Sequence, residues 1–404
     1  MKHLIPEKKT SLILAVLTLF AVVGPVSIDI FTPSLPAITH YFGTNNQTAQ
    51  WSVGLFMLGF SLSMLICGPL SDRYGRKKTL FVGYLLYLVA TVAILLTENI
   101  HLFIIARFFQ ALFGCFGTAI ARTLARDYYS DTMEVRMLAY IGACLTLAPM
   151  ISPIAGGFIQ EYAGWHYSFV VMLFLAVMAL AALSIIPERY QPATQKEGHA
   201  LSGYIHVLSD FRYLRLTVAS GAAFAGAFVF VAGASFVFIG QLSISPKIYG
   251  LIFAGAIASY MVSAAMAPRI NEKLTRLQCV QLSGIISILG AVISLISGIL
   301  SNGISVFGYI AGIFIYELGL GIYMPLCQAM ATEHIKKHMG TACSLIFFIE
   351  MLLATLISSA VHWLPEWGTT SLSIVTLLAI IFSTLCRLGI NSTMKKPSAS
   401  LPVD

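Results

Sequence analysis

Long runs of apolar residues, separated by short polar segments, dominate the pattern of this chain. A helix that crosses the hydrocarbon core of a membrane needs about 20 consecutive apolar residues, and it satisfies its backbone hydrogen bonds internally. Twelve runs are long enough. Their predicted extents are 11–38, 47–70, 79–97, 101–125, 137–160, 165–186, 213–240, 248–268, 277–300, 304–332, 339–363 and 369–390. The pattern predicts an all-α membrane protein with twelve transmembrane helices.

The longest polar break, from 187 to 212, divides the twelve runs into six plus six. Because an even number of helices separates the two sets, both have the same orientation in the membrane, as parallel repeats do in one large class of secondary transporter. The segment YIHVLSDFRYLR (204–215) is predicted to form a short amphipathic helix on the membrane surface. We expect three parts: an N-terminal six-helix bundle over 1–190, a cytoplasmic linker over 191–212 and a C-terminal six-helix bundle over 213–404.

Charge is scarce and unevenly placed. Only 10% of the residues are charged and 58% are hydrophobic, whereas soluble globular proteins carry roughly 25% charged residues. With the amino terminus in the cytoplasm, every Lys and Arg except Arg107, Arg122 and Lys247 falls at a cytoplasmic helix end. The positive-inside rule therefore predicts a multi-pass protein of the inner (plasma) membrane with both termini cytoplasmic. The net charge of +7 reflects this topology and does not indicate nucleic acid as a partner.

Metal chemistry and enzymatic catalysis are not indicated by the sequence. The seven cysteines have no ligand-like spacing and the nine histidines form no HExxH motif, so we expect no metal and no cofactor. The expected partners are a small-molecule substrate, protons and the lipid bilayer, with the chain acting as a monomer. A receptor that does not transport is the remaining alternative class, and a flux assay separates it from a carrier.

Four short stretches resemble one known family. GPLSDRYGRKKTL (68–80) resembles the signature between helices 2 and 3 of the major facilitator superfamily. DIFTPSLPAI (29–38), RFFQALFGCFGTAIARTLARD (107–127) and APMISPIAGGF (148–158) are similar to signatures of its drug:proton antiporters, in the bicyclomycin and chloramphenicol resistance branch. The resemblance implies the major facilitator fold, two six-helix bundles, and export driven by the proton gradient through alternating access. Export of an endogenous metabolite such as a siderophore is the alternative, while APMISPIAGGF (148–158) argues against an uptake symporter.

The first signature carries the predicted gating motif. Gly75 permits a tight turn, the cations keep this segment in the cytoplasm, and Asp72 sits at a helix end where it can accept hydrogen bonds. The resemblance implies that the motif latches the two halves while the carrier faces outward, and that Arg76 pairs with Asp127; the alternative is a simple positive anchor. APRINEKLTR (267–276) occupies the same place in the second half; it keeps a proline, an acid and several cations but loses the pattern. The gating residues are Gly68, Asp72, Arg73, Gly75, Arg76, Lys77 and Asp127.

Ionisable residues inside the predicted helices cost several kcal/mol each unless they are paired, hydrated or neutralised, so they are functional candidates. Asp29 and Arg107 lie at depths that match to roughly 5 Å, from a rise of 1.5 Å per residue, and can face each other. A carboxylate whose hydration changes as a cavity opens and closes can load and release a proton. The alternative is a permanent ion pair. The predicted proton-coupling residues are Asp29, with the principal role, Arg107, Glu317 and Glu350.

Glu317 and Glu350 fall near the midplane of the second half. If they face a central cavity, they attract a cationic drug or carry protons; otherwise they are protonated and hydrogen-bonded to neighbours. The helix-5 motif consists of Pro149, Pro153, Gly156 and Gly157. It predicts close helix packing and a bend that can seal the contact between the two halves and open as they move. A hydrophobic substrate cavity suited to planar or amphipathic molecules is predicted. Its candidate lining residues are Phe31, Phe56, Gln110, Arg122, Phe228, Tyr260 and Tyr316.

Overall fold

Twelve long apolar helices make up the molecule, as the hydropathy pattern predicts. The computed structural model describes residues 7–187, 200–301, 306–335, 338–364 and 368–388, and within these ranges all regular structure is helical. We call the helix ends that carry Gly75 and Thr275 the cytoplasmic end, following the charge bias, and the opposite end the outer end.

The first half contains six membrane helices, of which two are interrupted. The first is broken at Asp29, and the fourth at Cys115, where one helix ends and the next begins. The elements are α1 (Glu7–Asp29), the 3₁₀ turn η1 (Thr32–Ser34), α2 (Leu35–Tyr41), α3 (Asn46–Tyr74), α4 (Arg76–Leu96), α5 (Ile100–Gly114), α6 (Phe116–Tyr128), α7 (Asp131–Tyr162) and α8 (Trp165–Ala182).

The second half repeats this plan after a short additional helix. That helix, α9, confirms helical structure over part of the predicted amphipathic segment, and it packs against α10 and α14. The elements are α9 (Ala200–Leu208), α10 (Phe211–Ser235) with its π-helical end η2 (Phe236–Gln241), α11 (Pro246–Lys273), α12 (Arg276–Leu300), α13 (Val306–Thr332), α14 (Met339–Ser359) with the 3₁₀ turn η3 (Ala360–Trp363), and α15 (Thr369–Arg387).

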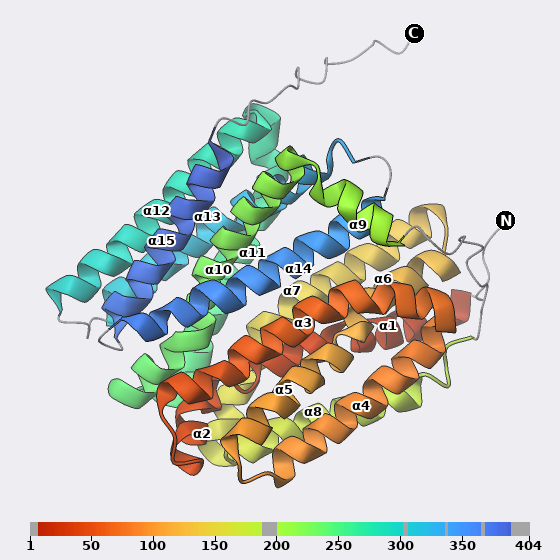
Figure 1. Ribbon diagram of the computed structural model, residues 1–404, viewed down its shortest axis with the longest axis horizontal. Helices are drawn as coiled ribbons and strands as arrows, with labels where there is room; N and C mark the ends of the chain where they lie inside the picture. The colour runs from red at the N-terminus through yellow and green to blue at the C-terminus, as the bar shows by residue number, and fades with distance from the viewer. Residues whose placement is uncertain (1–6, 188–199, 302–305, 336–337, 365–367, 389–404) are drawn as a thin grey trace.

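The helices form two bundles that lie side by side (Figure 1). Within each bundle the packing is dense, for example between α3 and α5 in the first and between α12 and α13 in the second. The bundles meet chiefly where α14 packs on α3 and α11 packs on α7. The fold class is therefore the predicted one, two six-helix bundles, with two helix pairs carrying most of the interface.

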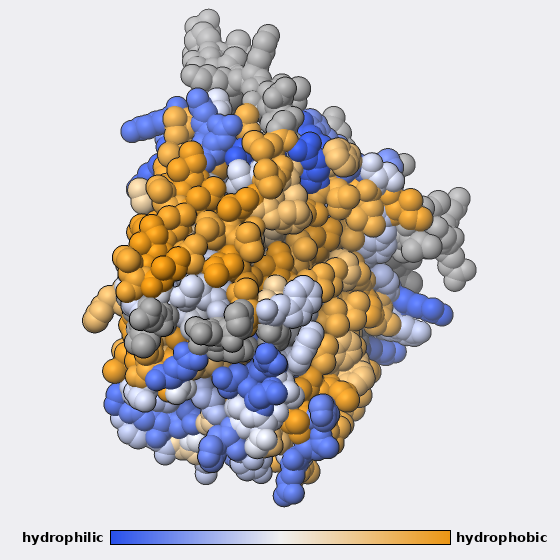
Figure 2. All heavy atoms as spheres, turned by 60° about the vertical axis from the view of Figure 1, so that its left-hand side comes forward, coloured by the Kyte–Doolittle hydropathy of each residue, from blue (hydrophilic) through white to orange (hydrophobic). Residues whose placement is uncertain are grey.

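A hydrophobic belt surrounds the bundles. Figure 2 shows a broad hydrophobic band across the middle of one face, with hydrophilic residues above and below it. Large apolar side chains recur on the outward stripe of peripheral helices at spacings of three and four residues, as a lipid-facing helix requires. On α4 and α12 these exposed residues are Phe81, Leu85, Val89, Val92, Leu96, Leu282, Ile285, Leu289, Ile293 and Ile296.

At the outer end, backbone touches backbone through glycines. A methyl group at Gly157 would lie 2.4 Å from the Pro246 carbonyl oxygen, and one at Gly250 would lie 2.3 Å from the Pro153 carbonyl oxygen. A methyl group at Gly156 would lie 1.9 Å from the Ile30 carbonyl oxygen. The close packing predicted for the helix-5 motif is present, and it joins α7 to α1 and to the second half. The outer end is closed in this structure.

We predict that Gly250→Ala opens the outer end. The added methyl group meets backbone that cannot rotate away. Overpacking of this kind typically costs about 1–3 kcal/mol, which shifts the balance toward a separated interface by about fivefold to more than a hundredfold. The measurement is the rate at which a membrane-impermeant thiol reagent, added outside, labels Ser34→Cys, a buried position of η1 at this interface.

Gly142→Ala is the matched control. This glycine lies on α7, which also forms the outer interface, but a methyl group there meets no atom within 4 Å. The same labelling rate in the Gly250 variant, the Gly142 variant and the parent would contradict closure by glycine contacts.

Candidate functional site

The first membrane helix breaks at the predicted coupling residue. Pro33 and Pro36 have no backbone N–H, so an α-helix cannot continue through them without losing hydrogen bonds. α1 accordingly ends at Asp29, whose carbonyl oxygen accepts a hydrogen bond of 2.9 Å from the Thr32 hydroxyl. The Asp29 side chain is 6% exposed. The break places a carboxylate in the closed interface between the halves, because η1 packs against α7, α10 and α11.

Arg107 is fully buried and is held by aromatic faces. Its guanidinium carbon lies 4.0 Å from the ring centre of Phe31 and 4.2 Å from that of Phe56. One terminal nitrogen donates to the Ser27 carbonyl oxygen at 3.0 Å and the other donates to the Gln110 amide oxygen. Among the described residues no carboxylate lies within 4.0 Å of its nitrogens. Cation–π contacts and neutral acceptors stabilise this cation in place of an acid.

The expected approach of Asp29 to Arg107 is therefore wrong for this conformation. Arg107 is bound to the carbonyl of Ser27, two residues before the helix break, and the break turns the chain toward the second half. Asp29 instead lies within electrostatic range of the Tyr249 hydroxyl on α11. Within the part of the chain that the structure describes, its carboxylate forms no ion pair and accepts no hydrogen bond.

A hydrogen-bond network positions Arg107 from two further helices. The Gln110 amide nitrogen donates to the Thr91 hydroxyl at 2.8 Å, and the Ser27 and Tyr87 hydroxyls lie 2.7 Å apart. Ser27, Tyr87 and Thr91 were not predicted from the sequence. Their hydroxyls fall inside apolar runs, where such residues are common, so no sequence signal distinguished them.

The second half holds a separate acidic cluster. Glu350 is fully buried; its Oε1 accepts hydrogen bonds from the Ser220 hydroxyl at 2.6 Å and the Gln328 amide at 2.7 Å, while Oε2 has no partner. Glu317 on α13 is 5% exposed. The Tyr260 hydroxyl on α11 lies within electrostatic range of both carboxylates. Two alternatives were predicted for Glu350, a position facing a central cavity and hydrogen bonding to neighbours. The structure shows hydrogen bonding to neighbours.

Most of the predicted cavity residues are packed in this conformation. Phe31 and Phe56 cover Arg107, Gln110 belongs to its network, Phe228 joins the core shared by both halves, and the Tyr316 hydroxyl donates to the Ala223 carbonyl oxygen at 2.6 Å. These side chains are packed against neighbours in this conformation, and their role in lining a substrate cavity stays a prediction.

Two predicted cavity residues keep exposed surface. Tyr260 and Arg122 are both half-buried. The Arg122 guanidinium on α6 lies 5.8 Å from the ring centre of Phe347 on α14, so it faces the second half.

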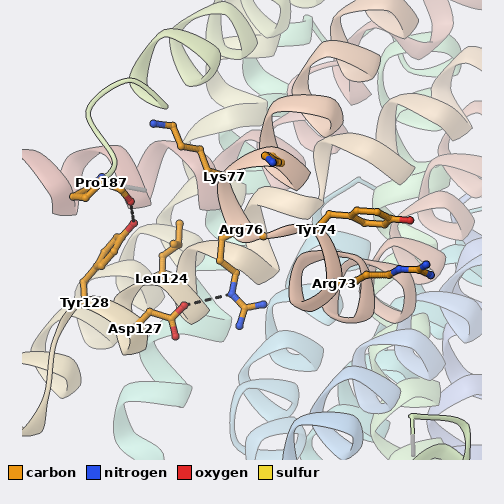
Figure 3. A pocket seen from close by; sticks show the side chains of 10 residues that line it. Arg73, Tyr74, Arg76, Lys77, Leu124, Asp127, Tyr128 and Pro187 are labelled. Atoms are coloured by element: carbon orange, nitrogen blue, oxygen red, sulfur yellow. Dashed lines mark hydrogen bonds and ion pairs between the residues drawn. The ribbon is translucent and has the colours of Figure 1, made fainter. Parts of the chain in front are cut away.

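The cytoplasmic signature is a helix–turn–helix. α3 continues to Tyr74, α4 begins at Arg76, and Gly75 between them has φ 93°, a backbone conformation that favours glycine. Arg76 donates to the Ser71 hydroxyl at 2.7 Å and pairs with Asp72. The predicted pairing with Asp127, at the end of α6, is present at 3.4 Å (Figure 3). Arg76 therefore ties the helix 2–3 turn to the fourth membrane helix.

This turn borders a cavity of about 260 Å³. The lining residues are Arg73, Tyr74, Gly75, Arg76, Lys77, Lys78, Leu124, Asp127, Tyr128 and Pro187. Lys77 donates to the Ile186 carbonyl oxygen at 3.1 Å, and a methyl group at Gly68 would meet no atom within 4 Å. These partners of Arg76 and Lys77 all belong to the first half, so the latch across the halves stays a prediction for the outward-facing state.

The second half retains part of the motif. At a spacing of 200 residues, Glu272 corresponds to Asp72, and Arg276, the first residue of α12, corresponds to Arg76. Glu333, after α13, pairs with Arg276 at 3.1 Å and with Arg212 at 3.7 Å, as Asp127 pairs with Arg76. As predicted, 267–276 keeps an acid and cations but not the full pattern, since Thr275 stands where the first half has Gly75.

Comparisons with known proteins agree with this architecture. The family model described as Major Facilitator Superfamily matches residues 17–359, which span both halves. The chain is 25% identical to a chloramphenicol resistance protein of Acinetobacter baumannii over 84% of its own length and 82% of that protein. It is 24% identical to a bicyclomycin resistance protein homolog of Haemophilus influenzae, over 88% and 90% of the two chains.

Among solved structures, the xylose transporter XylE from E. coli in a partially occluded inward open conformation matches with a TM-score of 0.74. That match has 12% identity and covers 96% of this chain and 100% of the transporter, and it shows the shared fold. The family model covers most of the chain, and resistance proteins of the predicted branch are among its relatives. The chain therefore belongs to the Major Facilitator Superfamily and is a membrane transporter, not an enzyme.

Proposed function

We propose that the chain is a proton-coupled exporter of small amphipathic molecules, working by alternating access of its two halves. The observation that carries the proposal is the placement of Asp29: a buried carboxyl at a helix break, at the interface between the halves, with no ion-pair partner among the described residues. The names of relatives in the drug-resistance branch support amphipathic drugs as the substrate class.

The coupling step follows from what burial does to a carboxylate. An unpaired charge away from water costs several kcal/mol, and protonation removes that cost. Asp29 holds a proton while the outer end is closed, because its carboxyl is buried and no cation among the described residues pairs with it. Opening the outer end hydrates the group and exchanges its proton with the outside, and substrate arriving from the cytoplasm expels that proton inward.

Arg107 responds to the change of charge on Asp29. Its Nε has no hydrogen-bond partner, and its contact with the first helix is the carbonyl of Ser27, two residues from Asp29. When Asp29 loses its proton, the carboxylate becomes a stronger acceptor than a carbonyl oxygen, and Arg107 moves to it. This rearrangement of the helix break links protonation to the position of η1.

The proton gradient is sufficient for uphill export. Each inward proton supplies roughly 2.3 kcal/mol per 100 mV of membrane potential and about 1.4 kcal/mol per pH unit. One proton per cycle can therefore drive a neutral molecule against a concentration ratio of more than tenfold.

A second coupling site is supported by the cluster around Glu350. Its unpartnered Oε2 can receive a proton or a cationic group of a substrate. Glu317 is a second buried carboxyl in this half, and the Tyr260 hydroxyl interacts electrostatically with both. This cluster is the alternative site for coupling.

We predict that Asp29→Asn abolishes uphill transport while leaving downhill exchange. The amide keeps the shape of the side chain but cannot exchange a proton. The measurement is accumulation of chloramphenicol, and separately of ethidium, against a gradient in proteoliposomes that carry an imposed proton gradient.

Glu317→Gln and Glu350→Gln are the matched comparisons. Uphill accumulation that survives in Asp29→Asn and disappears in one of the Glu variants would move the coupling site to the second half.

We predict that Arg76 and Asp127 are coupled in transport. Reversing either charge, by Arg76→Asp or Asp127→Arg, places like charges about 3–4 Å apart and should slow export markedly. Reversing both should restore part of it, with a coupling energy of about 0.5–3 kcal/mol. Initial export rates of the three variants at matched expression give this energy. Additive effects without rescue would show that the two residues act independently of each other.

A further inference from the structure

One ion pair crosses from the first half to the second. Lys247 Nζ, on α11, lies 2.7 Å from Glu161 Oε1, near the end of α7. The other ion pairs between described residues each stay within one half. Lys247 is also the one cation that the topology places at the outer end, against the positive-inside bias. A charge that opposes the topology signal, paired across the interface, indicates a specific role for the pair.

The pair has a fixed geometry. The backbone N–H of Lys247 donates to Glu161 Oε2 at 3.4 Å, so both oxygens of the carboxylate are engaged by one residue. The Lys247 ammonium lies 5.8 Å from the ring centre of Tyr162. Directly beneath, a methyl group at Gly157 would lie 3.0 Å from the Lys247 Cα. The ion pair therefore sits beside one of the two close glycine contacts between α7 and α11.

The pair cannot survive outward opening. Its two members belong to helices of different halves, and alternating access separates the outer ends of those helices. The Glu161 side chain is 22% exposed and that of Lys247 is 37% exposed. Water and salt therefore screen the pair partly, and its expected contribution to the stability of the closed interface is modest. A modest bond suits this position, because a gate must reopen in every cycle.

We propose that Glu161 and Lys247 are positioning residues that hold the outer end closed and so set the balance between the two conformations of the carrier. The proposal rests on the alternating access of the proposed function, but on neither its proton nor its substrate. It assigns to two outer-end residues a role that none of the family-like motifs includes.

The experiment measures the opening directly. Spin labels are placed at Leu96→Cys and Leu300→Cys, which lie at the outer ends of α4 and α12 and are 78% and 82% exposed, in a background where Cys144, Cys343 and Cys386 are serine. Distance distributions by pulsed electron resonance then report the population with separated outer ends. Glu161→Gln and Lys247→Gln should each raise that population roughly two- to fivefold, the range for a partly exposed pair.

Three further variants make the result specific. The double variant Glu161→Gln/Lys247→Gln should open no further than either single variant, and the swapped pair Glu161→Lys/Lys247→Glu should return toward the parent distribution. Glu134→Gln is the matched control, because Glu134 pairs with Arg126 at 3.8 Å inside the first half, and it should leave the distribution unchanged.

Two outcomes would overturn the proposal. One is an unchanged distance distribution in both single variants, which would show that the backbone contacts alone keep the outer end closed. The other is additive opening in the double variant, which would show that the two residues act through separate neighbours. Since the labels need neither proton gradient nor substrate, failure of proton coupling in the Asp29 variant does not alter either reading.

Discussion

An ionisable group in the hydrocarbon core must be paired, hydrogen-bonded or neutralised, and the first half of this transporter satisfies that constraint in two ways. Arg107, which stays charged, is sandwiched between Phe31 and Phe56 and donates to a carbonyl and an amide oxygen. Asp29 has no such partners in the described structure, and under the proposed function it is neutralised by a proton. The geometry thus separates a permanent cation from a carboxyl that can change charge, which is the requirement for coupling transport to protons.

Closure of the outer end and the state of Asp29 depend on the same contacts. η1 follows the helix break and packs against α7, α10 and α11, the elements that close the interface. Separation of α7 from α11 breaks the Gly157 and Gly250 contacts and the Glu161–Lys247 pair, and it also admits water to Asp29. Under the proposed function, packing therefore confines proton exchange to the open state. Tight glycine contacts give the interface two discrete arrangements, since backbone in van der Waals contact cannot yield gradually.

Residue patterns along one helix were predictable, whereas the rotation of helices about their axes was not. Apolar runs and Gly75 indicated the twelve helices and the turn before Arg76, and the family resemblance indicated its pairing with Asp127. Depth along a helix put Asp29 level with Arg107, but depth carries no information on facing, and a break at the prolines turned Asp29 away. The copy of the gating motif in the second half was readable from the spacing of Glu272 and Arg276, yet its acid partner, Glu333, is fixed only by tertiary packing.

The most direct test of this account is the protonation state of Asp29 in the outer-closed protein. Infrared difference spectra between the parent and Asp29→Asn, recorded at neutral pH without substrate, separate a protonated carboxyl from a carboxylate by their stretching bands. The account predicts that the variant loses a protonated-carboxyl band. Loss of carboxylate bands instead would show that Asp29 is charged inside the closed interface, and that its proton is not what the gradient drives.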